Sequence, residues 1–179
     1  NLNLFGEFQA SNALCALSIV IASGVDVETA VANMEKLSEV EGRLNLVATS
    51  ATGGKVIVDY AHSPDAIRAA LEACRSFTTG KLTIVFGCNG ERDLGKRKDM
   101  GAVAQALADN VIVTDGHPRS EDPATIRRDV LEGAPKAREI AGRSEAIAEA
   151  ISNLANGDTV LIAGLGHEIP SCPCFVRPV

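Results

Sequence analysis

The segment Val111-Ile112-Val113-Thr114-Asp115-Gly116-His117-Pro118-Arg119 passes from three β-branched apolar residues directly into a charged loop. Its apolar part has the composition of a strand that is buried on both faces. In an open α/β sheet, ligands bind beyond the carboxyl ends of the strands. The charged side chains of this loop are therefore expected at a ligand site, although a solvated connection in which Ser120 or Asp122 caps the next helix fits the same residues.

The same order, an apolar run followed by a polar loop, recurs along the chain. The apolar runs lie at residues 56–59, 82–86, 111–113 and 160–163. Helical patterns lie at residues 64–76, 98–108, 123–131 and 144–154. This βαβ order predicts an α/β fold with a mostly parallel sheet and right-handed connections. A hairpin turning at residues 52–54 is expected to precede it, and a short strand is expected at residues 138–141.

The first forty residues are predicted to be helical instead. Residues 11–23 have the Ala, Leu and Ile density of a buried helix that Ser11 or Asn12 could cap. Asp26 is expected to open a second helix over residues 27–37, with its apolar positions on one stripe. A boundary between this helical part and the α/β part is therefore predicted near residues 41–44.

Composition narrows the class of protein. A chain of 179 residues with a net charge of −6 and no clustered basic surface is not expected to bind nucleic acid. The five cysteines are odd in number and indicate a reducing compartment, and Cys172-Pro173-Cys174 lacks the partners of a metal site. The longest apolar run is too short for a membrane span and has no charged leader, so we expect a cytoplasmic protein without a membrane anchor.

Histidines and charged residues collect where the predicted strands end. His62, His117 and His167 each follow an apolar run, and parallel strands bring such positions to one edge. Arg92, with the nearby Lys96-Arg97 pair, lies in a glycine-containing loop that suits an anion. The alternatives are a mobile charged loop and, for His62, a bridge between backbone groups. Neither a nucleophile elbow nor a phosphate-binding loop is present, so the pattern favours binding of a polar substrate.

Taken in order, these stretches resemble the Mur ligases, and among them the members that add diaminopimelate. The resemblance covers residues 4–168 and rests on several motifs. These are Gly6-Glu7-Phe8-Gln9-Ala10-Ser11-Asn12, Gly42-Arg43, Asp59-Tyr60-Ala61-His62-Ser63-Pro64-Asp65, Gly90-Glu91-Arg92-Asp93, Gly95-Lys96-Arg97, His117-Pro118-Arg119-Ser120-Glu121-Asp122-Pro123 and Gly164-Leu165-Gly166-His167-Glu168.

The resemblance implies the part played by each segment. Residues 1–42 are expected to be the helical end of a central ATP-binding domain, residues 43–168 a Rossmann-like amino-acid-binding domain, and residues 169–179 a tail outside the family pattern. The implied reaction uses ATP to phosphorylate the carboxylate of a UDP-MurNAc-dipeptide, and the diaminopimelate amine then attacks the acyl phosphate. Mg²⁺ would act mainly through a central domain that this chain lacks, so the chain is expected to need the rest of the ligase for activity.

The resemblance also implies roles for individual residues. Those matching the meso-diaminopimelate site are Arg92, Gly116, His117, Pro118, Arg119, Gly164 and Glu168. Those matching positions near the nucleotide are Asn12, Arg43, Asp59, His62, Lys96 and Arg97.

The chain departs from the family's Asp-Asn-Pro-Arg signature, because Gly116-His117 precede Pro118-Arg119. Arg119 still provides a cation for a second carboxylate. A related amide ligase such as a folylpolyglutamate synthase, and a non-catalytic α/β module that binds a small ligand, are the alternative interpretations.

Overall fold

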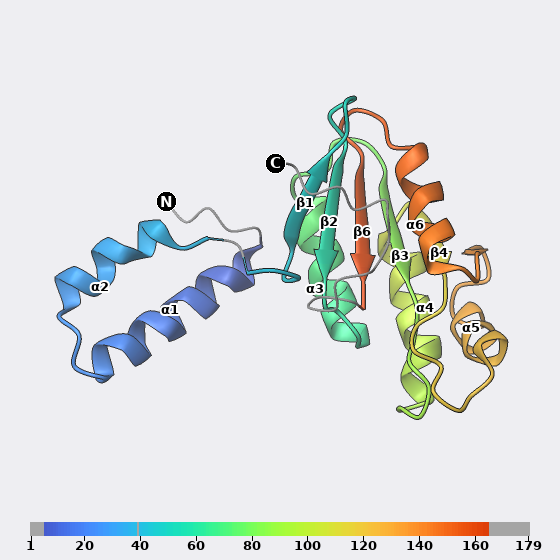
Figure 1. Cartoon of the computed structure of the whole chain (residues 1–179), viewed down its shortest axis with the longest axis horizontal. Coiled ribbons are helices and arrows are strands. Elements are labelled where there is room, and N and C mark those ends of the chain that lie inside the picture. The colour runs from blue at the N-terminus through green and yellow to red at the C-terminus, as the bar shows by residue number, and fades with distance from the viewer. Residues whose placement is uncertain (1–5, 39, 165–179) are drawn as a thin grey trace.

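The computed structural model describes residues 6–38 and 40–164, which form a helical hairpin and an α/β domain (Figure 1). The hairpin consists of α1 (Glu7–Ala22) and α2 (Val27–Asn33), and a short 3-10 turn (Met34–Lys36) follows it. It projects from the domain beside β1 and β2. The helical elements end at Lys36, and the first strand of the sheet begins at Asn45.

The hairpin corrects several details of the prediction. Helix α1 begins at Glu7 rather than Ser11, and its N-cap residue, Gly6, makes no side-chain capping bond. Asp26 does cap α2, because its carboxylate accepts from the Thr29 amide at 2.9 Å. Helix α2 ends at Asn33, so the predicted helix over residues 27–37 closes as a 3-10 turn.

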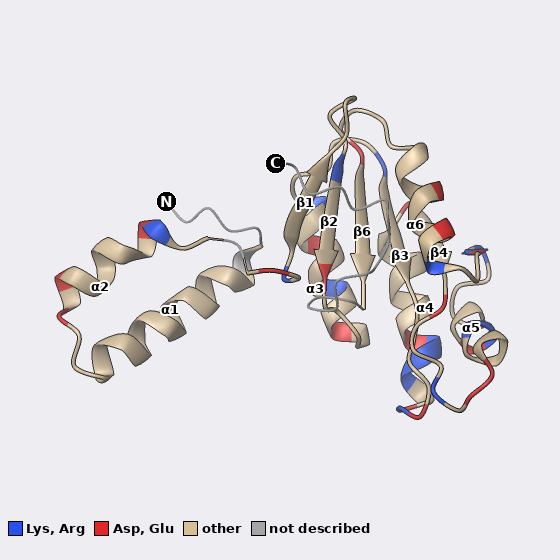
Figure 2. Cartoon of the chain, in the orientation of Figure 1, with Lys and Arg blue, Asp and Glu red and all other residues tan. Residues whose placement is uncertain are grey.

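The expectation that residues 11–23 form a buried helix is wrong for this chain. Leu14 and Ile19 on α1 are 61% and 69% exposed. Apart from Glu7 at its start, α1 contains no charged residue, as Figure 2 shows over the length of its ribbon. The apolar character that predicted burial is present, but the described chain supplies no surface to cover it.

The α/β domain is built on one six-stranded sheet with the order β1-β2-β6-β3-β4-β5. The strands are β1 (Asn45–Thr49), β2 (Lys55–Asp59), β3 (Leu82–Phe86), β4 (Asn110–Val113), β5 (Arg138–Glu139) and β6 (Thr159–Ala163). Strand β1 pairs with β2 as an antiparallel hairpin, and every other pairing is parallel. The mostly parallel sheet is therefore confirmed.

Helices cover both faces of the sheet. Helices α3 (Pro64–Arg75), α4 (Gly95–Leu107) and α5 (Pro123–Leu131) pack side by side on one face, and α6 (Arg143–Ser152) covers the other (Figure 1). Alternate residues of each strand supply the two cores: Ile84 faces the three-helix side and Val85 faces α6. Burial on both faces explains why the strands read as continuous apolar runs.

Most element boundaries agree with the sequence pattern. Strand β3 and helix α5 coincide with the predicted ranges, whereas α4 begins three residues before the predicted Lys98. Among the described residues, no helix combines the length and the apolar character that a membrane crossing requires.

Candidate functional site

The carboxyl ends of four neighbouring parallel strands lie at one edge of the sheet. Strands β2, β6, β3 and β4 run in the same direction, and their polar loops leave the sheet together. Backbone bonds join these ends: the Gly164 amide donates to Asp59, and the Thr114 amide donates to Phe86. Figure 2 shows charged residues at this edge and at the start of α4. The predicted convergence of strand-end loops is thus present in the fold.

A cavity of about 270 Å³ opens at this edge, and we call it the strand-end cavity. Its lining includes four residues that the sequence had placed at a site, namely His62, Arg92, Lys96 and Gly164. The other lining residues are Tyr60, Gly87, Cys88, Asn89 and Met100. The cavity is therefore framed by the loops after β2, β3 and β6 and by the first turns of α4.

Tyr60 lies at the centre of a group of basic side chains beside this cavity. The Arg43 guanidinium lies 4.8 Å from the centre of the Tyr60 ring, and the His62 ring meets the same ring edge to face at 4.8 Å. Lys96 Nζ donates to the His62 carbonyl at 3.1 Å. The group holds three basic side chains near one another at the end of β2, which is an arrangement suited to an anion.

The loops after β3 and β4 are bound to each other along their length. The Asn89 side-chain oxygen accepts from the His117 amide at 2.9 Å, and the Gly90 amide donates to the His117 carbonyl at 2.8 Å. A Cβ atom at Gly116 would lie 2.4 Å from the Cys88 carbonyl oxygen. Glycine thus allows the two loops to touch through their backbones, and Gly116 and His117 act here through main-chain contacts.

Arg119 lies on the outer side of these paired loops and not in the lining of the strand-end cavity. Its guanidinium lies 3.8 Å from the Glu91 carboxylate, and its side chain is 43% exposed. Glu91 also accepts from the amide and the hydroxyl of Ser120, and those hydrogen bonds lower the pKa of Glu91. Pro118 lies in a narrow crevice beside Cys88 and Arg127. The four-residue segment 116–119 is therefore held in place at this edge by its contacts with the loop after β3.

Arg97, which was expected near the nucleotide, is buried. Its side chain is only 1% exposed, and it donates to Asp129 at 2.9 Å and to both carboxylate oxygens of Glu121 at 2.8 and 2.9 Å. The two carboxylates raise the pKa of Arg97 against the opposing effect of its burial. A guanidinium enclosed in this way has no surface to offer a ligand, so Arg97 is expected to act through its contacts with Glu121 and Asp129.

A second cavity, of about 400 Å³, lies where the helical hairpin joins the domain, and we call it the junction cavity. It gathers Asn12, Arg43 and Asp59, which the sequence had grouped near a nucleotide. Asn12 donates to Gln9 across one turn of α1 at 3.0 Å. The remaining lining residues are Phe8, Gln9, Val40, Ala66, Ala69 and Ala70.

Asp59 is the buried carboxylate of this junction. Its two oxygens accept from the amides of Leu44 at 2.8 Å and Ala61 at 2.7 Å. Burial raises the pKa of Asp59, and those hydrogen bonds and the charge of Arg43 oppose the rise. Leu44 has a φ of 44°, so Asp59 holds a left-handed residue at the point where the chain enters the sheet.

The described residues near the strand-end cavity provide no activated nucleophile. Burial raises the pKa of the Cys88 thiol to about 11. Its sulfur lies 3.7 Å from the Met100 sulfur in the core. A thiol with this pKa stays protonated at neutral pH. Cys88 therefore contributes to this edge by packing against Met100.

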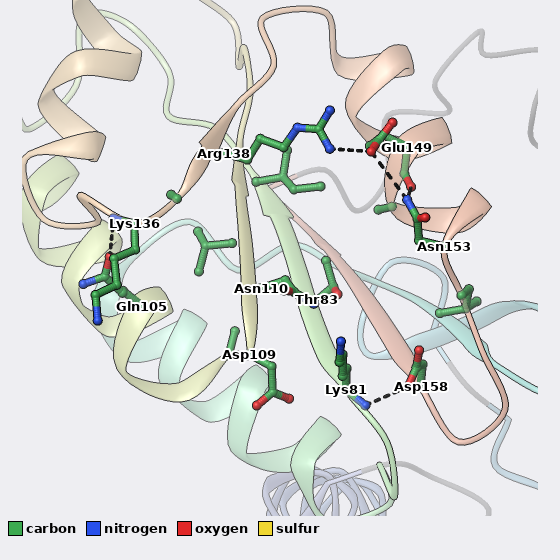
Figure 3. Close-up of a pocket in the computed structure, with 16 residues that line it drawn as sticks. Lys81, Thr83, Gln105, Asp109, Asn110, Lys136, Arg138, Glu149, Asn153 and Asp158 are labelled. Atoms are coloured by element: carbon green, nitrogen blue, oxygen red, sulfur yellow. Dashed lines mark hydrogen bonds and ion pairs between the residues drawn. The ribbon is translucent and has the colours of Figure 1, made fainter.

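A further cavity, of about 670 Å³, lies at the opposite end of the strands (Figure 3). Its carboxylates are already engaged: Glu149 pairs with Arg138, and Asp158 accepts from the Lys81 amide at 2.7 Å. Asp109 accepts from Arg75 at 2.8 Å. Ligands of α/β sheets bind at the carboxyl ends of strands, so we assign no ligand to this cavity and place the site at the strand-end edge.

Comparison with known proteins identifies the family. The family model described as Mur ligase, glutamate ligase domain matches residues 42–166, which is most of the chain. The chain belongs to the Mur ligase family. The match begins at the boundary between the hairpin and the sheet and ends just after β6, so it coincides with the α/β domain.

Relatives with curated names refine the position of this Mur ligase chain within the family. It is 52% identical over 168 residues to the UDP-N-acetylmuramoyl-L-alanyl-D-glutamate–2,6-diaminopimelate ligase of Chelativorans sp. (strain BNC1), covering 94% of the chain and 35% of that relative. It is 54% identical over 167 residues to the enzyme of the same name from Zymomonas mobilis, covering 93% of the chain and 34% of that relative. The chain therefore spans about a third of the length of these relatives.

Solved structures agree with this Mur ligase fold. A structure of a UDP-N-acetylmuramoyl-L-alanyl-D-glutamate–2,6-diaminopimelate ligase superposes with a TM-score of 0.70 at 36% identity, over 94% of this chain and 35% of that one. Folylpolyglutamate synthase from Mycobacterium tuberculosis, solved with ADP, gives 0.72 at 26% identity, over 91% of this chain and 38% of that one. The architecture is shared by both kinds of ligase, whereas sequence identity is higher with the first.

Some site residues were missed by the sequence analysis, and some lie outside the described residues. Tyr60 and Asn89 could have been selected because each follows a strand closely, while Met100 enters the lining because it lies one helical turn after Lys96. The predicted Glu168 and the third histidine, His167, lie outside the described residues, as do Cys172 and Cys174.

Proposed function

We propose that this chain is the amino-acid-binding part of an ATP-dependent ligase that adds meso-2,6-diaminopimelate to UDP-MurNAc-L-Ala-D-Glu. The observation that carries the proposal is the identity above 50% to ligases of that name over more than nine-tenths of the chain. The proposed reaction passes through an acyl phosphate made from ATP. We propose that this reaction takes place in the cytoplasm and is a step of peptidoglycan synthesis.

The residues of the strand-end edge fit the charges of diaminopimelate. Arg92 in the cavity lining and Arg119 on the neighbouring loop are the proposed partners of its carboxylates, because a guanidinium binds a carboxylate through two parallel bonds. Gly164, with a φ of 85°, is proposed to offer its backbone at close range. Glu168 is proposed to accept from an ammonium group of the same substrate.

The nucleotide is proposed to lie toward the junction. Asn12, Arg43 and Asp59 line the junction cavity. The Arg43 guanidinium lies over the Tyr60 ring, and Tyr60, His62 and Lys96 line the neighbouring strand-end cavity. The described residues contain no group of three or more His, Cys, Asp or Glu side chains that could hold a metal ion. Mg²⁺, which would neutralise phosphate charge when bound, is therefore proposed to be held by phosphates and by the remainder of the ligase.

The helical hairpin supports the proposal that this chain acts with further domains. Residues 1–42 are proposed to be the end of a central ATP-binding domain, residues 43–168 the amino-acid-binding domain, and residues 169–179 a tail outside the family pattern. The exposed apolar residues of α1 and α2, including Leu14, Ile19 and Val27, are what a helix pair shows when its packing partner is elsewhere. We expect the chain alone to be inactive.

The test joins this chain to the part of the Zymomonas mobilis relative that precedes the matched segment, and measures ADP release with the UDP-linked dipeptide. We expect release that depends on meso-diaminopimelate and is much weaker with L-lysine, which lacks the second carboxylate. Arg119→Ala should raise the KM for diaminopimelate by about tenfold to a hundredfold. Arg128→Ala, an exposed arginine on α5, is the matched control and should have little effect.

Two results would contradict the proposal. Equal ADP release with L-lysine would remove the proposed specificity, and no release with any amino acid, glutamate included, would favour a non-catalytic binding module. Release with glutamate and a folate instead of the UDP-linked dipeptide would indicate the folylpolyglutamate synthase alternative.

A further inference from the structure

Arg97 is among the largest fully buried side chains of the described chain, although it is charged. It lies in the first turn of α4 and joins three elements, because it donates to Asp129 on α5 and to Glu121 in the loop after β4. A weaker contact of 3.5 Å reaches the Asn89 carbonyl in the loop after β3. One guanidinium thus connects both loops of the strand-end edge to the helices behind them.

The contacts of Glu121 carry this connection outward to Arg119. Besides Arg97, the Glu121 carboxylate accepts from the Glu91 amide. The Glu91 carboxylate in turn accepts from the Ser120 amide and hydroxyl and faces the Arg119 guanidinium. The chain of contacts runs from the buried Arg97 through two carboxylates to the exposed arginine.

Both residues at the outer end of this chain of contacts have an uncommon backbone conformation. Glu91 has a φ of 55° and Arg119 a φ of 53°, in the left-handed region that non-glycine residues seldom occupy. Such residues keep this conformation only where surrounding contacts hold them. Two such contacts are present: the Glu91 amide donates to the Glu121 carboxylate, and the Ser120 amide donates to the Glu91 carboxylate.

We propose that Arg97 is a positioning residue that holds the loops after β3 and β4 together and thereby fixes Arg119 for the substrate carboxylate. The identity of that substrate rests on the function proposed above. Stability alone explains Arg97 poorly, because its Nε atom is buried without a partner among the described residues and buried ion pairs often add little to stability. A planar guanidinium can bind two carboxylates at once in fixed geometry, which suits a role in positioning.

The test measures steady-state kinetics of the joined ligase described above, with Arg97→Met and Arg97→Lys. We expect Arg97→Met to raise the KM for meso-diaminopimelate by about tenfold or more, with the KM for ATP within about twofold of the parent. Arg97→Lys should be intermediate, since an ammonium group lacks the fork that reaches both carboxylates. Arg128→Met on the exposed side of α5 is the matched control.

A second variant keeps the test informative if Arg97→Met does not fold. Glu91→Ala removes only the exposed end of the chain of contacts, so it should leave the melting temperature nearly unchanged while raising the same KM. An unchanged KM for diaminopimelate in both Arg97→Lys and Glu91→Ala overturns the inference. Equal rises in the KM for ATP and for diaminopimelate also overturn it, because they indicate general damage.

Failure of the proposed function can be told apart from failure of this inference. If the joined ligase uses another amino acid, the same comparison is made with the KM for that amino acid. If it releases no ADP at all, hydrogen exchange of the backbone amides is measured in this chain alone, with and without the Arg97→Lys substitution. Arg97→Lys should then speed exchange of the Glu91 and Ser120 amides by about tenfold and leave β3 and β6 unchanged. Equal exchange in both proteins would overturn the inference.

Discussion

At the scale of single residues, small backbone distances decide the shape of the strand-end edge. Gly87, Gly90 and Gly116 all lie where a Cβ atom would approach a carbonyl oxygen of the opposite loop within 2.4 Å. These glycines let the loops after β3 and β4 exchange main-chain hydrogen bonds. The departure from the family signature at residue 116 therefore has a local structural consequence, which is close packing against Cys88.

The first prediction concerns Gly116→Ala. The added methyl would lie 2.4 Å from the Cys88 carbonyl oxygen and 2.8 Å from the Asn89 side-chain oxygen. We expect the free energy of unfolding to fall by about 1 to 3 kcal/mol, as for other overpacked sites, in urea titrations. Gly95→Ala is the control, because its Cβ would approach only the flexible Asp93 carboxylate at 3.3 Å and it opens a helix. Equal losses in the two variants would contradict this account.

At the scale of elements, Asp109 ties α3, β3 and β4 together. Its carboxylate accepts from the Leu82 amide at 2.7 Å, at the start of β3, and from Arg75 at the end of α3 at 2.8 Å. The hydrogen bond from the Leu82 amide and then the pairing with Arg75 lower the pKa of Asp109 below its ordinary value. Because the folded pKa is below the unfolded one, the stabilising contribution is present above about pH 4 and is lost as the pH falls through the folded pKa.

The second prediction follows from the lowered pKa of Asp109. Asp109→Asn should lower the free energy of unfolding at pH 7 by about 0.5 to 1 kcal/mol, a small value because both partners are more than two-fifths exposed. The difference from the parent should shrink as the pH is lowered below 4. Urea titrations at pH 7 and pH 3 measure it, with Asp99→Asn on the exposed side of α4 as the control. A deficit that is the same at both pH values would argue against the ionised carboxylate as its source.

At the scale of the whole molecule, the helical hairpin and the α/β domain differ in how much of their apolar surface is exposed. The domain encloses its apolar residues, with Ile84 fully buried, whereas the hairpin exposes Ile19 at 69%. The hairpin extends away from the sheet and touches it only near its base (Figure 1). The folding energy of the chain is therefore concentrated in the domain.

The third prediction compares these two isoleucines. In this chain, Ile19→Glu should change the free energy of unfolding by less than about 0.5 kcal/mol, while Ile84→Ala should lower it by about 2 to 5 kcal/mol. In the joined ligase, Ile19→Glu should become destabilising by about 1.5 to 3 kcal/mol if the hairpin packs on the preceding domain. Thermal and urea unfolding of both proteins measure this. An Ile19 variant that is neutral in the joined ligase would show that the hairpin has no partner there.

The sequence by itself determined the strands, the helices and the edge at which the loops meet, because these depend on local periodicity and on the direction of parallel strands. It placed Arg92, Lys96, His62 and Gly164 at one edge, and the strand-end cavity contains all four. Only the tertiary structure decided which charged side chains reach that cavity. Lys96 and Arg97 are neighbours in sequence, yet the turn of α4 directs the first toward the cavity and the second into the interior between two carboxylates. The exposure of α1 was equally beyond the sequence, since an apolar pattern shows what a surface can bury but not whether a partner covers it.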